Sequence, residues 1–203
     1  ATSPEIKQSL INAVKIYGVG SGASTQICGY SEIHATVEKQ FAEFLKRDKA
    51  ILFGSGYLAN LGVMSALANR NTTIVSDKFC HASIIDGIQL SRAKHSRFRH
   101  QDVDQLGTIL RDKKRSLVVT EGLFSMEGDI SPLDQIADIC KSNDSLLVVD
   151  DAHGIGVLGQ NGRGSCDLFQ LSQADVACLI TPLGKAFGSY GSIVAGDKDV
   201  IET

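Results

Sequence analysis

Residues 146–154 read Leu146-Leu147-Val148-Val149-Asp150-Asp151-Ala152-His153-Gly154, which is an apolar run followed by two carboxylates, a small residue, a histidine and a glycine. A short run that is apolar throughout and stops at polar residues is typical of a strand buried on both faces of a parallel sheet. Ligands of open α/β sheets bind beyond the carboxyl ends of the strands. The stretch therefore predicts a buried parallel strand and, at its end, a place for functional side chains.

Outward from this stretch, short apolar runs alternate with segments of helical periodicity. The alternation predicts an α/β fold with a mostly parallel sheet and helices on both faces. No linker or repeat divides the chain, so residues 1–203 are interpreted as one domain. The expected strands are 50–53, 73–76, 95–99, 116–121, 146–150, 176–181 and 192–195. The expected helices are 5–16, 32–45, 59–69, 82–91, 102–112 and 132–141, and residues 17–29 are expected to form a glycine-rich loop.

The composition narrows the functional class. The chain has 203 residues, of which 43% are hydrophobic, and a formal net charge of −3. This balance argues against nucleic-acid and membrane-surface partners, and no apolar run reaches the length of a membrane span. Five cysteines, an odd number without zinc-site spacing, predict reduced thiols, no metal site and a cytoplasmic location. Residues 1–7 lack the apolar core of a signal peptide.

Lys185 follows Gly184 in a turn that comes directly after the apolar run 177–180. We expect an apolar setting for this amine, which would lower its pKa and make part of it nucleophilic. Asp150, at the end of the preceding strand, is suited to keep a heteroaromatic nitrogen protonated. A lysine for a Schiff base and an aspartate for a pyridinium suggest pyridoxal 5′-phosphate (PLP) as cofactor. The alternative is an ordinary loop lysine with two solvated aspartates.

Three further motifs lie where a strand gives way to a helix or a loop. Ser55-Gly56-Tyr57 opens a helix, where free N–H groups and the helix dipole can hold a phosphate. His81 precedes another helix and is suited to stack on a flat cofactor, although for this motif alone a histidine that caps its own helix is the more ordinary interpretation. Ser125 follows a strand and can hydrogen-bond a phenolic oxygen or a substrate carboxylate, a weak signal because serine is common in loops.

Asp150 and Asp151 are both candidates to contact the pyridine nitrogen of PLP, and periodicity alone does not choose between them. His153 can hydrogen-bond the 3′-oxygen of PLP. Residues 154–159 match the pattern G-x-G-x-x-G of dinucleotide-binding proteins. That fingerprint requires a long helix directly afterwards, and the glycine-rich residues 160–165 do not predict one. We therefore interpret the match as unrelated to NAD binding.

Taken in order, these blocks resemble the α-oxoamine synthases, a branch of the fold-type I PLP enzymes, and the resemblance covers essentially the whole chain. It implies the large PLP-binding domain of that fold, with the family's N-terminal arm and C-terminal small domain outside these 203 residues. The matching blocks are Gly20-Ser21-Gly22, Cys28-Gly29-Tyr30-Ser31 with His34, Ser55-Gly56-Tyr57, His81-Ala82-Ser83, Thr120-Glu121-Gly122 with Phe124-Ser125-Met126, residues 150–154, residues 162–165 and Gly184-Lys185.

The resemblance also implies a role for each matching residue. Lys185 would form the Schiff base and later move the Cα proton. Asp150 would face the pyridine nitrogen, and His81 would stack on the ring with a catalytic part. His153 and Ser125 would lie near the 3′-oxygen, whereas Gly56 and Tyr57 would offer backbone amides to the phosphate.

One departure from the family pattern concerns the phosphate. Relatives commonly carry a serine or threonine three residues before the lysine, and here that residue is Pro182, which has neither a hydroxyl nor an N–H. Thr181, one residue earlier, is the expected substitute.

Residues 29–31 and 151–156 are most similar to the family member of the biotin pathway. This similarity implies a PLP-dependent acyltransferase that condenses L-alanine with a pimeloyl thioester of CoA or acyl carrier protein and releases CO2. The rivals are acetyl transfer to glycine and a non-catalytic partner subunit. The family also implies a homodimer in which residues 20–25 lie beside the cofactor cleft.

Overall fold

The computed structural model describes residues 3–113 and 115–203. The expectation that residues 1–7 are not a signal peptide therefore lies outside the described residues where it rests on residues 1 and 2. Seven strands form one sheet in the order β1-β7-β6-β5-β4-β2-β3. All neighbouring strands are parallel except that β7 runs antiparallel to both β1 and β6. The expected mostly parallel sheet is confirmed. The strands are β1 Lys49–Phe53, β2 Thr73–Asp77, β3 Lys94–Phe98, β4 Leu117–Glu121, β5 Leu146–Asp150, β6 Cys178–Pro182 and β7 Ser192–Gly196.

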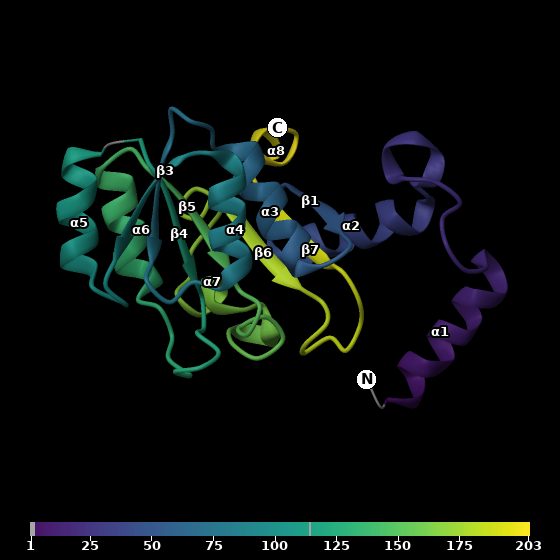
Figure 1. The fold of residues 1–203 in the computed structure, drawn as a ribbon. Helices are drawn as coiled ribbons and strands as arrows, with labels where there is room; N and C mark the ends of the chain where they lie inside the picture. Colours follow the sequence, from purple (N-terminus) through teal and green to yellow (C-terminus); the bar gives the residue numbers. More distant parts are fainter. Residues whose placement is uncertain (1–2, 114) are drawn as a thin grey trace.

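Helices cover both faces of the sheet, as expected (Figure 1). Within the described residues, no helix is long and apolar enough to cross a membrane. The α-helices are α1 Pro4–Tyr17, α2 Glu32–Leu45, α3 Gly56–Leu67, α4 Ala82–Ser91, α5 Val103–Asp112, α6 Leu133–Ser142, α7 Ser165–Leu168 and α8 Lys198–Ile201, with a π-helical turn η1 at Thr25–Gly29 and a 3₁₀ turn η2 at Gln160–Gly162.

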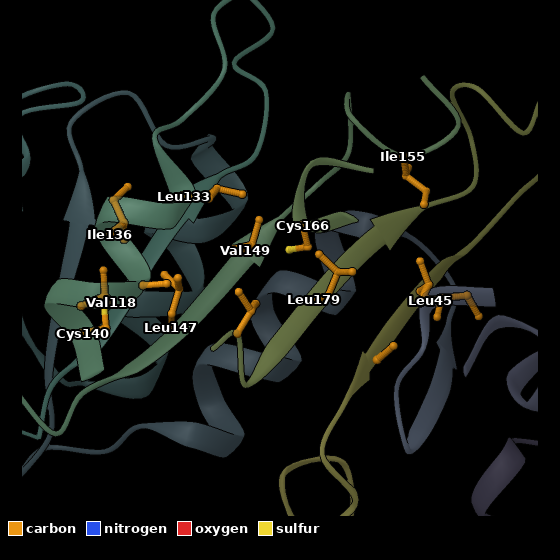
Figure 2. Close-up of a cluster of buried hydrophobic side chains, with 14 of the residues drawn as sticks. Leu45, Val118, Leu133, Ile136, Cys140, Leu147, Val149, Ile155, Cys166 and Leu179 are labelled. Atoms are coloured by element: carbon orange, nitrogen blue, oxygen red, sulfur yellow. The ribbon is translucent and has the colours of Figure 1, made fainter. Parts of the chain in front are cut away.

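Two hydrophobic clusters lie on opposite faces of the sheet, because successive side chains of a strand point to opposite faces. In β4, Val118 belongs to the cluster under α2, α5 and α6, whereas Leu117 and Val119 belong to the cluster under α3 and α4. Figure 2 shows Val118 and Leu147 of the first cluster packed beside the side chains of α6. This double coverage explains why the strands are apolar throughout rather than alternating.

Most helix boundaries agree with the sequence pattern, and α2 and α4 have the expected bounds. Helix α3 begins three residues earlier than expected, because Ser55 acts as its N-cap and accepts a hydrogen bond from the Leu58 N–H at 3.2 Å. The expected loop 17–29 is partly wrong, since Thr25–Gly29 forms a π-helical turn. The short helices α7 and α8 had no signal strong enough to predict them.

Helix α1 stands apart from the sheet and its covering helices (Figure 1). None of its residues is buried, although the periodicity gives it an apolar side. Leu10 is 65% exposed, and Ile6, Ile11 and Val14 are also exposed. An amphipathic helix gains most of its stability in a protein by packing its apolar face, so within one chain α1 lacks that contribution.

Candidate active site

A cavity of about 340 Å³ opens at the carboxyl edge of the sheet, on the face covered by α3 and α4. The ends of β4, β5 and β6 contribute to it, together with the first residues of α3 and α4 and the loop between β6 and β7. The lining residues are Ser55, Gly56, Tyr57, Asn60, His81, Ser83, Glu121, Asp150, Ala152, His153, Pro182, Gly184, Lys185, Tyr190 and Gly191.

Six of the eight candidate residues from the sequence meet in this cavity, although they are far apart in the chain. They are Gly56, Tyr57, His81, Asp150, His153 and Lys185. Ser125 and Thr181 are not among the lining residues. The sequence missed Asn60, Ser83 and Glu121, which line the cavity as well.

Asp150 ends β5 and is almost fully buried. Asn60 donates a hydrogen bond from Nδ2 to Asp150 Oδ2 at 2.7 Å, and the Ala152 N–H donates to Oδ1 at 3.1 Å. Burial raises the pKa of Asp150 above its ordinary value, although these hydrogen bonds and the charge of Lys185 partly offset the effect. A positively charged group in the cavity would therefore be favoured beside this carboxylate.

Asp151 faces the other side of the sheet, as the alternation of side chains along a strand requires. Its Oδ2 accepts the Ser165 N–H at 2.8 Å. A Cβ at Gly122, Gly154 or Gly164 would meet the Asp151 carboxylate at 2.3 Å or less, so the three glycines leave room for it. Burial raises the pKa of Asp151 to about 7. The structure thus separates the two aspartates: Asp150 lines the cavity, and Asp151 is enclosed by backbone.

Glu121 is the largest omission from the sequence-based site. It is paired in register with Asp150 on the neighbouring strand, so the two carboxylates lie at the same edge. Its Oε1 accepts the His81 N–H at 2.7 Å. Burial, followed by the negative charge of Asp150, raises the pKa of Glu121 to about 7. The signal available in the sequence was a carboxylate at the end of an apolar strand, the same feature that identified Asp150.

His81 caps its own helix, α4, which was the alternative to a role in cofactor binding. It also lines the cavity. Its Nδ1 accepts the Ser83 N–H at 3.2 Å at the start of α4. This contact fixes the orientation of the ring. His153 is half-buried, and burial together with the charge of Lys185 lowers its pKa. The two histidines thus enter the cavity from different loops of the carboxyl edge.

The expectation of an apolar setting for Lys185 is wrong. Lys185 is exposed in the loop between β6 and β7. Its neighbours are acidic rather than apolar, because its charge lowers the pKa of both Glu121 and Asp150 from what burial alone would give. The lysine therefore lies at the mouth of the cavity, opposite two carboxyl groups.

The N-terminus of α3 forms one wall of the cavity. A Cβ at Gly56 would meet Pro182 Cγ at 2.6 Å, so the two residues are in close contact and glycine is required here. Thr181 is fully buried, and its hydroxyl donates to the Ile193 carbonyl at 3.3 Å. The expected substitution of Thr181 for a phosphate-binding hydroxyl is wrong, because strand alternation turns Thr181 away from the face on which Pro182 lies. Ser55 provides the hydroxyl that lines the cavity beside Gly56.

Ser125 is exposed in the loop of residues 122–131 that follows β4. The Phe124 N–H donates to the Asp129 carbonyl at 3.0 Å, and Leu123 pairs with Ile130 in an isolated bridge. The loop is therefore closed on itself, with Ser125 near its tip. It departs from Glu121, a lining residue of the cavity.

Two other features do not form a competing site. A larger cavity, of about 640 Å³, lies beside α2 and α7. Of the three cations that line it, Lys46 and Arg163 face Asp167 at 3.9 and 2.8 Å, and Arg47 donates to the Val176 carbonyl at 3.2 Å. Residues 154–159 form turns, and the short turn η2 follows them in place of a long helix. The dinucleotide interpretation is therefore excluded for this segment.

Comparison with known proteins places these features in context. The whole chain, residues 1–203, matches the family described as aminotransferase class I and II. An 8-amino-7-oxononanoate synthase of Marinobacter nauticus is 49% identical over 203 residues, which are all of this chain and 52% of the relative. The protein of the same name from Methylococcus capsulatus is 45% identical, over all of this chain and 53% of the relative. The chain thus spans about half the length of the curated relatives it matches.

Solved structures share the fold. The crystal structure of an 8-amino-7-oxononanoate synthase from Francisella tularensis is 38% identical, with a TM-score of 0.87 over 99% of this chain and 56% of that one. Serine palmitoyltransferase from S. paucimobilis, with a bound PLP-myriocin aldimine, is 32% identical, with a TM-score of 0.94 over 99% of this chain and 51% of that one.

Proposed function

The chain belongs to the class I and II aminotransferase family, and from this membership we propose that it provides the PLP site of an 8-amino-7-oxononanoate synthase. The reaction is the decarboxylative condensation of L-alanine with a pimeloyl thioester, a step of biotin biosynthesis. The observation that carries the proposal is the cavity in which Lys185, Asp150, His81 and His153 meet. The relatives named 8-amino-7-oxononanoate synthase support the proposal, because their sequence identity to this chain, 49% and 45%, is higher than the 32% of the serine palmitoyltransferase.

The donor and acceptor groups of the cavity fit PLP. Asp150 is a buried carboxylate with a raised pKa, suited to a protonated ring nitrogen. The N-terminus of α3 offers the Gly56 and Tyr57 amides to a phosphate. Ser55 accepts a hydrogen bond from the helix through its oxygen, which leaves its own proton free to donate to an anion. When bound, PLP supplies the electron sink that stabilises negative charge at the amino-acid Cα.

The protein contributes position and proton transfer. Lys185 would hold the aldehyde carbon of the cofactor until the amine of alanine displaces it, and the freed lysine amine would then accept the proton from the Cα of alanine. Asp150 would hold a proton on the pyridine nitrogen, and Asn60 orients this carboxylate. His81 would lie against the cofactor ring, in the orientation that its cap on α4 fixes. His153, and Ser125 on its loop, are the candidates for the 3′-oxygen. These residues would orient the reacting groups, and such orientation supplies a large part of the rate acceleration in an enclosed active site.

The substrate assignment is tested by a comparison of amino acids. The purified protein with PLP should form new visible absorbance with L-alanine and release CO2 when pimeloyl-CoA or pimeloyl-acyl carrier protein is added. Glycine with acetyl-CoA should give turnover at least about tenfold slower, because the two reactions differ in a single methyl and in the acyl chain. Faster turnover with glycine would select the acetyltransferase. PLP binding without turnover of either amino acid would select a non-catalytic subunit.

We also propose a homodimer in which the apolar side of α1 packs against the second copy. The side chains Leu10 and Val14 are exposed on a helix that has no buried residue. Residues 20–25 do not line the cavity within one chain, so in this proposal they approach it from the second copy. Apolar helix faces of this kind commonly become buried in obligate interfaces.

Leu10→Asp is expected to weaken the dimer, because it places a charge in the apolar contact. Light scattering over a concentration series should show monomers at concentrations where the unmodified protein is dimeric. The matched control is Asn12→Asp, which adds the same charge to the same helix at a polar residue that bonds Gln8. An unmodified protein that stays monomeric would contradict the proposal, as would an equal effect of both variants.

A cytoplasmic location completes the proposal. All five cysteines are free thiols, which agrees with a reducing compartment.

A further inference from the structure

His100 lies between two carboxylates that belong to different segments. Its Nδ1 is 3.0 Å from Asp77 Oδ1, and its Nε2 is 2.9 Å from Asp129 Oδ2. The ring stacks on Phe79 and packs perpendicular to the ring of Phe124, with both centroid separations at 4.5 Å. The imidazole is therefore held at both nitrogens and packed on two sides.

With both carboxylates ionised, this geometry favours one protonation state of His100. An ionised carboxylate only accepts hydrogen bonds, and a neutral imidazole has a single N–H to donate. Both ring nitrogens of His100 face carboxylate oxygens, so both contacts are satisfied together only by the doubly protonated, positively charged ring. Asp77 is almost fully buried, and charged hydrogen bonds of this kind are stronger than neutral ones.

The two carboxylates anchor the segments that lead to candidate site residues. Asp77 ends β2 and accepts the Phe79 N–H at 2.8 Å, in the segment that runs to His81. Asp129 lies in the loop of residues 122–131, which carries Ser125. Next to His100, the Gln101 side chain donates to the Ile130 carbonyl of the same loop at 3.2 Å.

We propose that His100 is a positioning residue that fixes the loop of residues 122–131, and with it Ser125, against the segment that delivers His81. The significance of this loop for catalysis rests on the proposed function, but the anchoring itself does not. Without the bridge, the loop keeps its internal hydrogen bonds, the Gln101 contact and the bonds at its two ends, where the Gly122 N–H donates to the Asp150 carbonyl at 2.8 Å and the Ser131 hydroxyl donates to the Glu121 carbonyl at 2.6 Å. The exposed tip between these ends then opens more readily.

The bridge makes the loop sensitive to pH. Burial alone would lower the pKa of His100, but the hydrogen bonds to Asp77 and Asp129 outweigh burial and raise it. Two further charged groups lie near this site: Lys78, 6.0 Å from the ring centre of Phe79, and Glu121, whose pKa the charge of Asp77 helps to raise. Because the folded pKa is raised, the bridge stabilises the loop fully below the ordinary histidine pKa, and this contribution is lost as pH rises through the folded pKa.

Limited proteolysis of the cofactor-free protein, followed by mass mapping, tests the anchoring. Cleavage within residues 122–131 should accelerate about tenfold between pH 6 and pH 9, which corresponds to about 1.4 kcal/mol. A free peptide of this sequence corrects for the protease's own pH dependence. His100→Phe keeps the aromatic packing, and His100→Gln keeps a polar group. Both should cleave rapidly at all pH values, with the cuts confined to the loop.

Two further variants sharpen the test. Asp129→Asn removes the charge on the loop side, so the rise in cleavage should move to lower pH. His95→Gln is the matched control, because this histidine of β3 bonds the neutral Ser76 hydroxyl at 2.9 Å, and its profile should match the unmodified protein. Equal cleavage of the loop in the unmodified protein and in both His100 variants would overturn the proposal. So would a pH profile that Asp129→Asn does not change.

PLP titration provides an independent readout. His100→Gln should bind PLP about tenfold more weakly at pH 7 if the loop contributes to the site. Failure of the unmodified protein to bind PLP would refute the proposed function, while the proteolysis result would still decide whether His100 positions the loop.

Discussion

Lys185→Ala is expected to lower turnover by about four orders of magnitude, because it removes both the amine that binds the cofactor aldehyde and the base that takes the Cα proton. The fold should survive, since the side chain is exposed and lies in the loop between β6 and β7. Steady-state kinetics with L-alanine and pimeloyl-CoA measure the loss, and circular dichroism checks the fold.

A chemical trap identifies the lysine directly. Borohydride treatment of the PLP-bound protein should leave a stable pyridoxyl group on the peptide that contains Lys185. The control is Lys198→Ala, which removes an exposed lysine of α8 and should leave both labelling and turnover unchanged. Label on Lys198, or a Lys185→Ala protein with more than a tenth of normal turnover, would show that the assignment is wrong.

Local patterns predicted the strands and most helices well, because this sheet is covered on both faces. Its strands are apolar throughout and end at polar residues, and β5 has the expected bounds. Parallel strands bring their carboxyl ends to one edge, so residues as distant as His81 and Lys185 could be assigned to one site before the structure was known. The resemblance to a family then gave those residues their roles.

The errors arose where a residue's surroundings depend on strands that are distant in sequence. Alternation along β6 places Thr181 and Pro182 on opposite faces, but which of the two faces the cavity depends on the neighbouring strands. In the structure the Thr181 hydroxyl bonds the Ile193 carbonyl of β7. Asn60 lies in an apolar helix, and nothing local shows that it meets Asp150, which follows 90 residues later. Lys185 was expected in an apolar setting because the preceding strand is apolar, yet the loop after that strand returns to solvent.

Asp150→Asn is expected to reduce turnover by about 10²- to 10³-fold, comparable to the loss of one preorganised electrostatic group in other enzymes. The amide has nearly the same shape as the carboxylate but cannot hold a proton on the pyridine nitrogen by its charge. A flip of the Asn60 side chain would present its oxygen, which has no hydrogen-bond partner among the described residues, to the new amide. PLP should therefore still bind, and kcat rather than the affinity for PLP should fall.

Asp150→Asn should lower turnover but raise the thermal stability of the cofactor-free protein. Burial raises the pKa of Asp150, so in the folded, cofactor-free protein the charged form is disfavoured. An acid with a raised pKa stabilises the fold below its ordinary pKa, and this contribution is lost as pH rises through the folded value. At pH 8 the charge is then a cost, and Asp150→Asn should raise the melting temperature of the cofactor-free protein while it lowers turnover.

Asp151→Asn is the matched control for this last test, because the two aspartates are adjacent and both buried but face opposite sides of the sheet. It changes the group enclosed by Gly122, Gly154 and Gly164, and it should leave turnover within about tenfold of normal because Asp151 does not line the cavity. A larger loss from Asp151→Asn than from Asp150→Asn would reverse the assignment. A fall in melting temperature for Asp150→Asn would mean that the Asp150 charge stabilises the cofactor-free protein, as a structural aspartate would. It would contradict the view that this charge destabilises the protein until a cationic partner binds.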